Sequence, residues 1–370
     1  MSASHPAGAG PPPTGPPYPQ KYAQLGGRPT RHVDIPVCAM FIVFFLGSAV
    51  INMTIFQKNK KIGHKFIPSV LFFGFSMARL TALSMRIAWT IHIKNINLAL
   101  ASAIFVAAGV LLLFVVNLLF AQRIVRAYHP KFGWKRTVTL IFRSLLGTVV
   151  ALLVMVITST VYSFFTLDDA ARQKCRNIQL FTGVYLAVIA FLPLPIVGLT
   201  LLWPGKNRRE VEKFGNGRMR TKLALLITTS TLLSLGAWFR AATNFVPREP
   251  QHPAWYHSKA CFYFFNFGIE VIVVYLYALS RFDRRFHVPD GSSKPGHYSG
   301  IIEITKEGKF IHSGSGESSN RGPSPDADDG EEEEKEEEER HPETRNTAEI
   351  VRPPKKEGGS REGPDSGVVA

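Results

Sequence analysis

The chain has 370 residues, of which 46% are hydrophobic and 19% are charged, and its formal net charge is +15. As a single soluble domain, this composition would indicate a basic protein that binds nucleic acid. The charge is unevenly divided: residues 1–280 hold 29 basic and 7 acidic side chains, and residues 281–370 hold 14 basic and 21 acidic ones. Apolar runs of about 20 residues recur in the first part. They exclude a soluble globular protein and leave no reason to expect a nucleic-acid partner.

Seven apolar runs are long enough to cross a bilayer as helices. In hydrocarbon every backbone N–H and C=O must be paired within the segment, and the runs lack the alternation of a strand. The predicted fold class is therefore all-α, a polytopic membrane bundle of seven transmembrane helices over residues 35–280. Pro193 and Pro195 predict a kink in the fifth span. The predicted spans are Ile35–Phe56, Ile67–Ile91, Leu98–Ala121, Val138–Phe165, Ile178–Trp203, Lys222–Phe245 and His257–Ser280.

The charge of the loops predicts how the bundle is oriented. The loops after the first, third and fifth spans carry 15 Lys and Arg residues, whereas those after the second, fourth and sixth carry five. Because short cytoplasmic loops hold the excess of basic residues, the N-terminus is predicted outside and the C-terminus in the cytoplasm. The plasma membrane is the expected location.

Both ends of the chain are predicted to lie outside the bundle. Residues 1–34 are rich in Pro and Gly, which indicates a disordered extracellular segment too short for a ligand-binding domain. Residues 281–370 are predicted to form a largely disordered cytoplasmic tail, because the acidic run near residues 328–339 cannot bury enough apolar surface to fold. Any ligand must then be met by the bundle itself.

Two charged residues are expected to meet near the middle of the membrane. Arg79 in the second span and Glu270 in the seventh both lie near the midplane, at about 1.5 Å of rise per residue. A charge there costs roughly 2.5–3.5 kcal/mol, so an Arg79–Glu270 ion pair is predicted. The pair has either a purely structural role or a part in ligand binding. Asn266, one helical turn before Glu270, is placed to hydrogen-bond with it.

Two further arginines lie nearer the outside. Arg86 follows Arg79 by two turns on the same helix face, and Arg240 has a similar depth in the sixth span. With no acid predicted among them, they would form a cationic pocket for a carboxylate or phosphate. The alternative is that both side chains extend outward to lipid headgroups or cap carbonyls near their helix ends.

Cysteines and catalytic motifs add little. Cys38, Cys175 and Cys261 are predicted near the outer surface, where Cys175 and Cys261 would form a disulfide or remain unpaired like the third thiol. The sequence has no nucleophile elbow, no phosphate-binding glycine loop and no histidine cluster within the spans. No enzyme activity, metal or cofactor is therefore predicted.

Several stretches carry a resemblance to known proteins. They resemble a family of fungal seven-span membrane proteins of unknown function, often labelled family-C-like G-protein-coupled receptors, and are loosely similar to the fungal lipid-translocating exporters of the aminocholesterol-resistance family. The resemblance covers roughly residues 33–290 and implies an integral membrane protein of fungal origin, without assigning a ligand or functional residues. The stretches are Ser76–Leu80, Arg86–Trp89, Tyr128–Pro130, Trp238–Ala242 and Ala254–Phe286.

These observations favour a receptor-like protein that senses a small anionic or lipidic ligand through its helix bundle. Its expected partners are membrane lipids and a cytoplasmic signalling protein that contacts the basic inner loops and the acidic tail. The alternative is a transporter of lipids or other amphiphiles. The sequence leaves the oligomeric state open.

Overall fold

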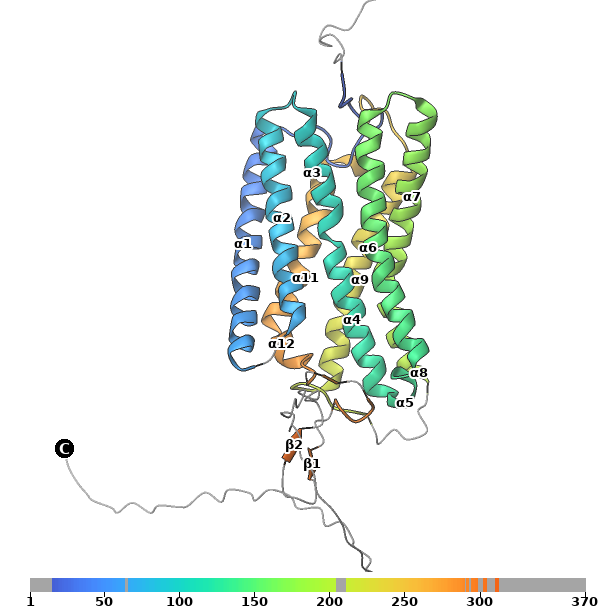
Figure 1. Ribbon diagram of the computed structural model, residues 1–370. Coiled ribbons are helices and arrows are strands. Elements are labelled where there is room, and N and C mark those ends of the chain that lie inside the picture. The colour runs from blue at the N-terminus through green and yellow to red at the C-terminus, as the bar shows by residue number, and fades with distance from the viewer. Residues whose placement is uncertain are drawn as a thin grey trace, which may run out of the picture. The chain divides into compact units, whose positions relative to one another are not determined.

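The computed structural model describes residues 15–63, 66–203, 211–289, 291–292, 294–298, 302–304 and 310–312. Its bundle is all-helical, and seven helices are long and apolar enough to cross a membrane, which confirms the predicted fold class (Figure 1). The seven spans are Arg31–Lys61, Ile67–Ile91, Ile96–Tyr128, Arg136–Phe165, Asp169–Leu202, Met219–Phe245 and Lys259–Leu279.

The first three spans are α1 (Arg31–Lys61), α2 (Ile67–Ile91) and the successive helices α3 (Ile96–Gly109) and α4 (Leu111–Tyr128). After the short α5 (Pro130–Gly133), the next three are α6 (Arg136–Phe165), α7 (Asp169–Phe191) with α8 (Pro193–Leu202), and α9 (Met219–Phe245). The seventh follows the 3-10 turn η1 (Trp255–His257) and comprises α10 (Lys259–Tyr263), the π-helix η2 (Phe264–Gly268) and α11 (Ile269–Leu279). Then come α12 (Phe282–Arg285) and an antiparallel pair of strands, β1 (Ile302–Ile304) and β2 (Phe310–His312).

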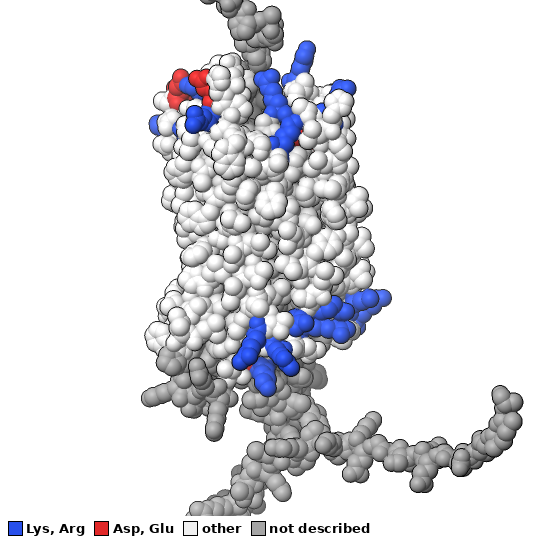
Figure 2. Space-filling view, turned by 180° about the vertical axis from the view of Figure 1, so that it is seen from behind, with Lys and Arg blue, Asp and Glu red and all other residues white. Residues whose placement is uncertain are grey.

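The surface of the bundle matches a protein that lies in a bilayer. On the face shown in Figure 2, Lys, Arg, Asp and Glu side chains gather at the two ends and leave an uncharged band between them. In Figure 1, α1 and α2 lie together at one side and α6 and α7 at the other. The end that carries residues 15–30 is called the outer end below, after the orientation predicted from the loop charges.

Three of the described spans are interrupted. The third breaks at Val110, between α3 and α4, and the seventh contains the π-helix η2. The fifth breaks between α7 and α8 at Pro193, as predicted, because proline has no N–H to continue the helical ladder. A break frees backbone carbonyls inside the bundle, where a side chain must then satisfy them.

Residues 18–30 form a segment that we call the outer strap, which differs from the disordered segment predicted for residues 1–34. Its backbone N–H groups donate to three other segments: Tyr18 to the Phe164 carbonyl at 2.7 Å, Ala23 to Arg248 at 2.8 Å and Gly26 to His257 at 3.0 Å. These bonds hold it across the outer ends of the helices. Residues 1–14 lie outside the described part of the chain.

One glycine makes the path of the outer strap possible. Gly26 has φ +81°, and a Cβ atom there would lie 2.6 Å from the ring of Phe262. Glycine alone combines this left-handed backbone with the close approach of the ring. The sequence shows that glycine is frequent in this segment, but it does not show that one of these glycines packs against the ring of Phe262.

The inner end is covered by described parts of the loop before α9 and of the tail. The ring of Phe286 stacks on Phe120 at 4.1 Å, and Tyr298 contacts the rings of Trp134 and Phe214 at 5.4 and 5.7 Å. Burial raises the pKa of Tyr298. The first part of the predicted disordered tail therefore packs on the bundle, while the acidic run near residues 328–339 lies outside the described residues.

A polar network fills the inner half of the bundle. The Tyr277 hydroxyl donates to Asn117 Oδ1 at 2.7 Å and lies 2.8 Å from the Thr229 hydroxyl, and Asn117 Nδ2 donates to the Ser230 hydroxyl at 3.0 Å. These side chains come from α4, α9 and α11 and are buried. The network joins the three helices and closes the centre of the bundle below the midplane.

Candidate functional site

The two charges expected at the midplane are brought together. Arg79 donates from Nε to Glu270 Oε2 at 2.6 Å and from Nη2 to Glu270 Oε1 at 2.5 Å. The exposed fractions of the two side chains are 0% and 1%. This two-pronged geometry is the strongest arrangement available to a guanidinium and a carboxylate, and burial requires it because either charge alone would be costly.

The remaining Nη1 of Arg79 is satisfied by the break between α3 and α4. It donates to the carbonyls of Val106 and Phe105 at 2.7 and 3.3 Å. The N–H of Val110 is directed to the Ala108 carbonyl, so the Val106 carbonyl lacks its usual helical partner. Gly109 leaves the necessary room, since a Cβ atom there would lie 3.0 Å from the guanidinium. The break therefore supplies carbonyl acceptors for the buried Arg79, and Arg79 supplies the donor that these carbonyls lack.

Arg240 is the third member of this group. Its Nη1 lies 4.0 Å from Glu270 Oε1 and donates to the Phe265 carbonyl of η2 at 3.1 Å. Unlike the other two, its side chain is 21% exposed. Glu270 thus serves two arginines, and the group carries one positive charge in excess.

Asn266 does not make the bond expected from its spacing. Its Nδ2 donates instead to the Phe262 carbonyl at 2.8 Å. The π-helix η2 contains Asn266 and adds a residue to the turn, so Asn266 and Glu270 no longer occupy stacked positions of a regular α-helix. The prediction of an Asn266–Glu270 hydrogen bond was wrong for this reason.

The second predicted arginine, Arg86, does have an acidic partner. Its Nε and Nη2 donate to Asp34 Oδ1 at 3.1 and 3.0 Å, and Asp34 also accepts from Lys259 Nζ at 2.6 Å and from the Tyr263 hydroxyl at 2.8 Å. The expectation that no acid faces the outer arginines was therefore wrong. The physical reason is that α1 begins at Arg31, which places Asp34 in its buried first turn.

Arg86 also ties the outer strap to this group. Its Nη2 donates to the Gly26 carbonyl at 3.1 Å, and its guanidinium lies over the ring of Phe262 at 4.5 Å. Arg86, Asp34, Lys259 and Tyr263 are together called the outer latch below. The latch connects α1, α2 and α10 to the outer strap.

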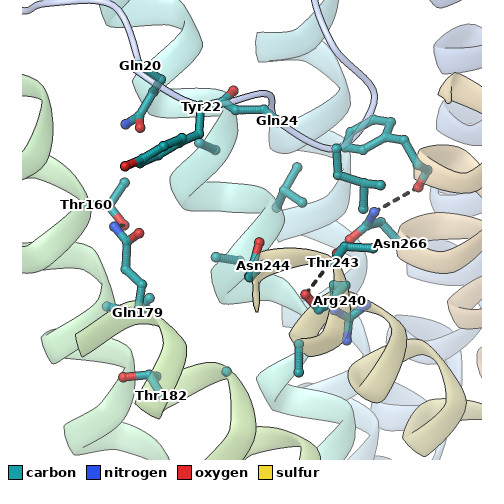
Figure 3. Close-up of a pocket in the computed structure, with 18 of the residues that line it drawn as sticks. Gln20, Tyr22, Gln24, Thr160, Gln179, Thr182, Arg240, Thr243, Asn244 and Asn266 are labelled. Atoms are coloured by element: carbon teal, nitrogen blue, oxygen red, sulfur yellow. Dashed lines mark hydrogen bonds between the residues drawn. The ribbon is translucent and has the colours of Figure 1, made fainter. Parts of the chain in front are cut away.

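A cavity of about 360 Å³ lies below the outer strap among α3, α6, α7 and α9 (Figure 3). Its volume falls within the range of small-molecule sites. Arg240 and Asn266 line it from the bundle, and Gln20, Tyr22 and Gln24 line it from the outer strap.

The cavity is cationic. The described residues that line it include Arg86, Arg176 and Arg240 and no Asp or Glu. Burial lowers the pKa of His257 and so favours its uncharged form. Asp34 of the outer latch neutralises Arg86, and the Arg176 guanidinium lies over the Tyr22 ring at 5.0 Å. Arg240, which lies next to Glu270, has N–H groups left to donate to a ligand.

No disulfide forms among the three cysteines, all of which are described. Cys175 is buried in α7, Cys261 lies in α10, and the Cys38 thiol is 3.1 Å from the Tyr263 hydroxyl. Of the two alternatives left open by the sequence, the structure has the unpaired thiols and not the Cys175–Cys261 bridge, which needs a specific approach of two backbones that residue spacing cannot show.

Sequence analysis missed Asp34, Gly109 and the polar residues of the outer strap. A signal for Asp34 existed: Thr30 is the N-cap of α1, and its backbone N–H donates to Asp34 at 2.8 Å. Thr followed by an acid within the first turn is typical of a helix start. No comparable signal marks the strap residues, whose position depends on tertiary contacts.

Comparison with known proteins gives similarity to one family over part of the chain and no function. A family described as a protein of unknown function (DUF3112) matches residues 130–218 and 215–287, which include Arg240 and Glu270 but not Asp34, Arg79 or Arg86. No curated protein and no solved structure matches the chain. The chain is thus a seven-span membrane protein similar in this region to an uncharacterised family.

Because Glu270 is shared by two arginines, neutralising Glu270 and neutralising Arg79 should lower the stability of the protein by different amounts. Glu270→Gln should be the more destabilising change, by about 3–5 kcal/mol, because it leaves the buried Arg79 and the part-exposed Arg240 without their shared counterion. Arg79→Gln should cost less, since Glu270 keeps Arg240 as a partner. Thermal unfolding of the purified variants in detergent measures both. Equal losses, or a larger loss for Arg79→Gln, would contradict the shared arrangement.

Loss of the outer latch should loosen the outer strap. Asp34→Asn removes the charge that holds Arg86 and Lys259, so a cysteine at Ala23→Cys should react at least several-fold faster with a membrane-impermeant maleimide. Asp169→Asn is the matched control, because Asp169 binds the strap residue Lys21 at 2.9 Å with both side chains exposed. Labelling of the three native cysteines is measured in the corresponding proteins that retain Ala23 and is subtracted from each rate. If the two variants label alike, the latch does not hold the strap.

Proposed function

We propose that the protein is a receptor-like sensor of the plasma membrane that binds a small anion, either soluble or lipidic, in the cavity below the outer strap. The observation that carries the proposal is Arg240, whose part-exposed side chain lines a cavity with no carboxylate in its described lining. A carboxylate or phosphate there could accept two parallel hydrogen bonds from the guanidinium. The buried Arg79–Glu270 pair would act by holding this guanidinium in place.

A sensor must transmit occupancy of the cavity to the inner end. Arg240 contacts Glu270 in the seventh span, and α11 of the same span continues to Tyr277 and the inner polar network. A ligand that competes with Glu270 for Arg240 would therefore act on the helix that reaches the inner face. The cytoplasmic partner is expected to contact the basic inner loops; residues 204–210 of the loop before α9 lie outside the described part.

A translocator of lipids or other amphiphiles is the second candidate. It is favoured by the helix interruptions near the cavity: Val110 and Asn266, from two of the broken spans, are part of its lining. Broken helices near the membrane midplane are typical of transporter binding sites. The sensor is favoured by the buried network of Asn117, Tyr277 and Thr229, which links α4, α9 and α11 on the inner side of Glu270.

Anion binding is tested with Arg240→Gln. The purified protein in nanodiscs of neutral lipid is titrated with octanoate and octyl phosphate, with octylammonium as the probe of opposite charge. Loss of a charge-assisted pair of hydrogen bonds should weaken binding of both anions roughly 10- to 100-fold. Arg143→Gln is the matched control, because Arg143 is exposed on α6 and does not line the cavity. Equal binding by Arg240→Gln, or binding of octylammonium as tight as that of octanoate, would contradict the proposal.

The two candidates are separated in proteoliposomes loaded on one side with octyl phosphate. A translocator moves the probe across the bilayer at a rate that Arg240→Gln lowers, whereas a sensor binds it without transfer. Transfer above that of protein-free liposomes would replace the sensor with the translocator.

A further inference from the structure

The lining of the cavity changes character with depth. The polar side chains Gln20, Gln24, Thr160, Gln179 and Asn244, from the outer strap, α6, α7 and α9, lie around its outer part together with apolar residues (Figure 3). Arg240 lies one helical turn inward from Asn244. An anionic group bound to Arg240 would therefore have polar surroundings on its outer side.

The inner part of the cavity is mostly apolar, with the hydroxyl of Thr182 on α7 as a polar group in its lining (Figure 3). On each helix that reaches it, the lining residue nearest the inner end is apolar: Phe114 on α4, Val156 on α6, Leu186 on α7 and Ala237 on α9. Ala237 is one turn inward from Arg240, and the change occurs at the level of the guanidinium, because Arg240 Nη1 would lie 3.7 Å from a Cβ atom at the neighbouring Gly236.

The apolar part has considerable depth. Val106 lies at the level of the buried ion pair, because its carbonyl accepts from Arg79. Phe114 is eight residues further along, which corresponds to roughly 12 Å along the helix axis. A ligand consisting of a small anion alone would leave this space without apolar contacts.

We propose that the ligand is a single-chain amphiphile with a carboxylate or phosphate headgroup on Arg240 and an alkyl chain that extends inward toward Phe114 and Leu186. This inference rests on the proposed anion site and adds the class of molecule and its direction. Burial of each methylene group contributes roughly a factor of three to four in affinity. Affinity should therefore rise with chain length until the apolar part is filled.

Gly183 offers a way to shorten the apolar part. It lines the cavity from α7, one turn before Leu186, and a Cβ atom there would meet nothing within 4 Å. In Gly183→Leu the new side chain should extend into the cavity without displacing the helices. Gly147→Leu is the matched control, because Gly147 lies in α6 outside the cavity and has equally open space.

The experiment measures affinities of the series hexanoate, octanoate, decanoate and dodecanoate for the full-length protein in nanodiscs, with the alkyl phosphates as a second arm. Because both glycine variants use the same lipid, partitioning of the probes into the bilayer cancels in their comparison. Gly183→Leu should lose at least tenfold in affinity for the longer chains relative to Gly147→Leu and retain hexanoate binding. Arg240→Gln should weaken every chain length by a similar factor. The arm with the higher affinity identifies the headgroup.

Three results would overturn the inference. If affinity depends on Arg240 but not on chain length, the ligand is a small anion and the proposed anion site stands without the amphiphile. If chain length matters equally in both glycine variants, the chain does not lie in the inner part of the cavity. If no carboxylate or phosphate binds, the proposed function fails together with this inference.

Discussion

A single carboxylate in the middle of the membrane determines how this bundle is built. Glu270 is the one acid near the midplane among the described spans, and it faces the guanidinium groups of both Arg79 and Arg240. Hydrocarbon gives a charge no water to interact with, so the helices that carry these residues must meet at one depth and in one orientation. The ion pair fixes α2 against α11, and the additional arginine brings α9 to the same point.

The departures from regular helix follow from this constraint. Arg79 has more N–H groups than one carboxylate can accept, and the break after Gly109 supplies the carbonyls of Phe105 and Val106. Arg240 finds its carbonyl in the π-helix η2. The outer latch repeats the same stoichiometry, with Asp34 between Arg86 and Lys259. In each group one acid serves two cations, and near the midplane the surplus charge is on the arginine that faces the cavity.

Much of the fold could be predicted from the sequence because the bilayer restricts the choices so strongly. Helix lengths, the break at Pro193 and the depths of Arg79 and Glu270 all follow from apolar runs and a fixed rise per residue. Contacts could not be predicted in this way where they depend on how a helix is turned about its axis or on the residue at which it begins. Asp34 was missed because α1 begins four residues before its apolar run, and Asn266 was misplaced because a π-helix changes the spacing. The outer strap was missed because its contacts with Phe164, Arg248 and His257 join distant parts of the chain.

The structure requires Glu270 to be an ionised carboxylate shared by two arginines. Infrared difference spectroscopy of the wild type against Glu270→Gln, with carboxylates isotopically labelled, measures its ionisation directly in the membrane at neutral pH. The substitution should remove the bands of an ionised carboxylate and no band of a protonated acid. Loss of a protonated-acid band would show that Glu270 is neutral, and the arrangement of the two arginines around a shared negative charge would then be wrong.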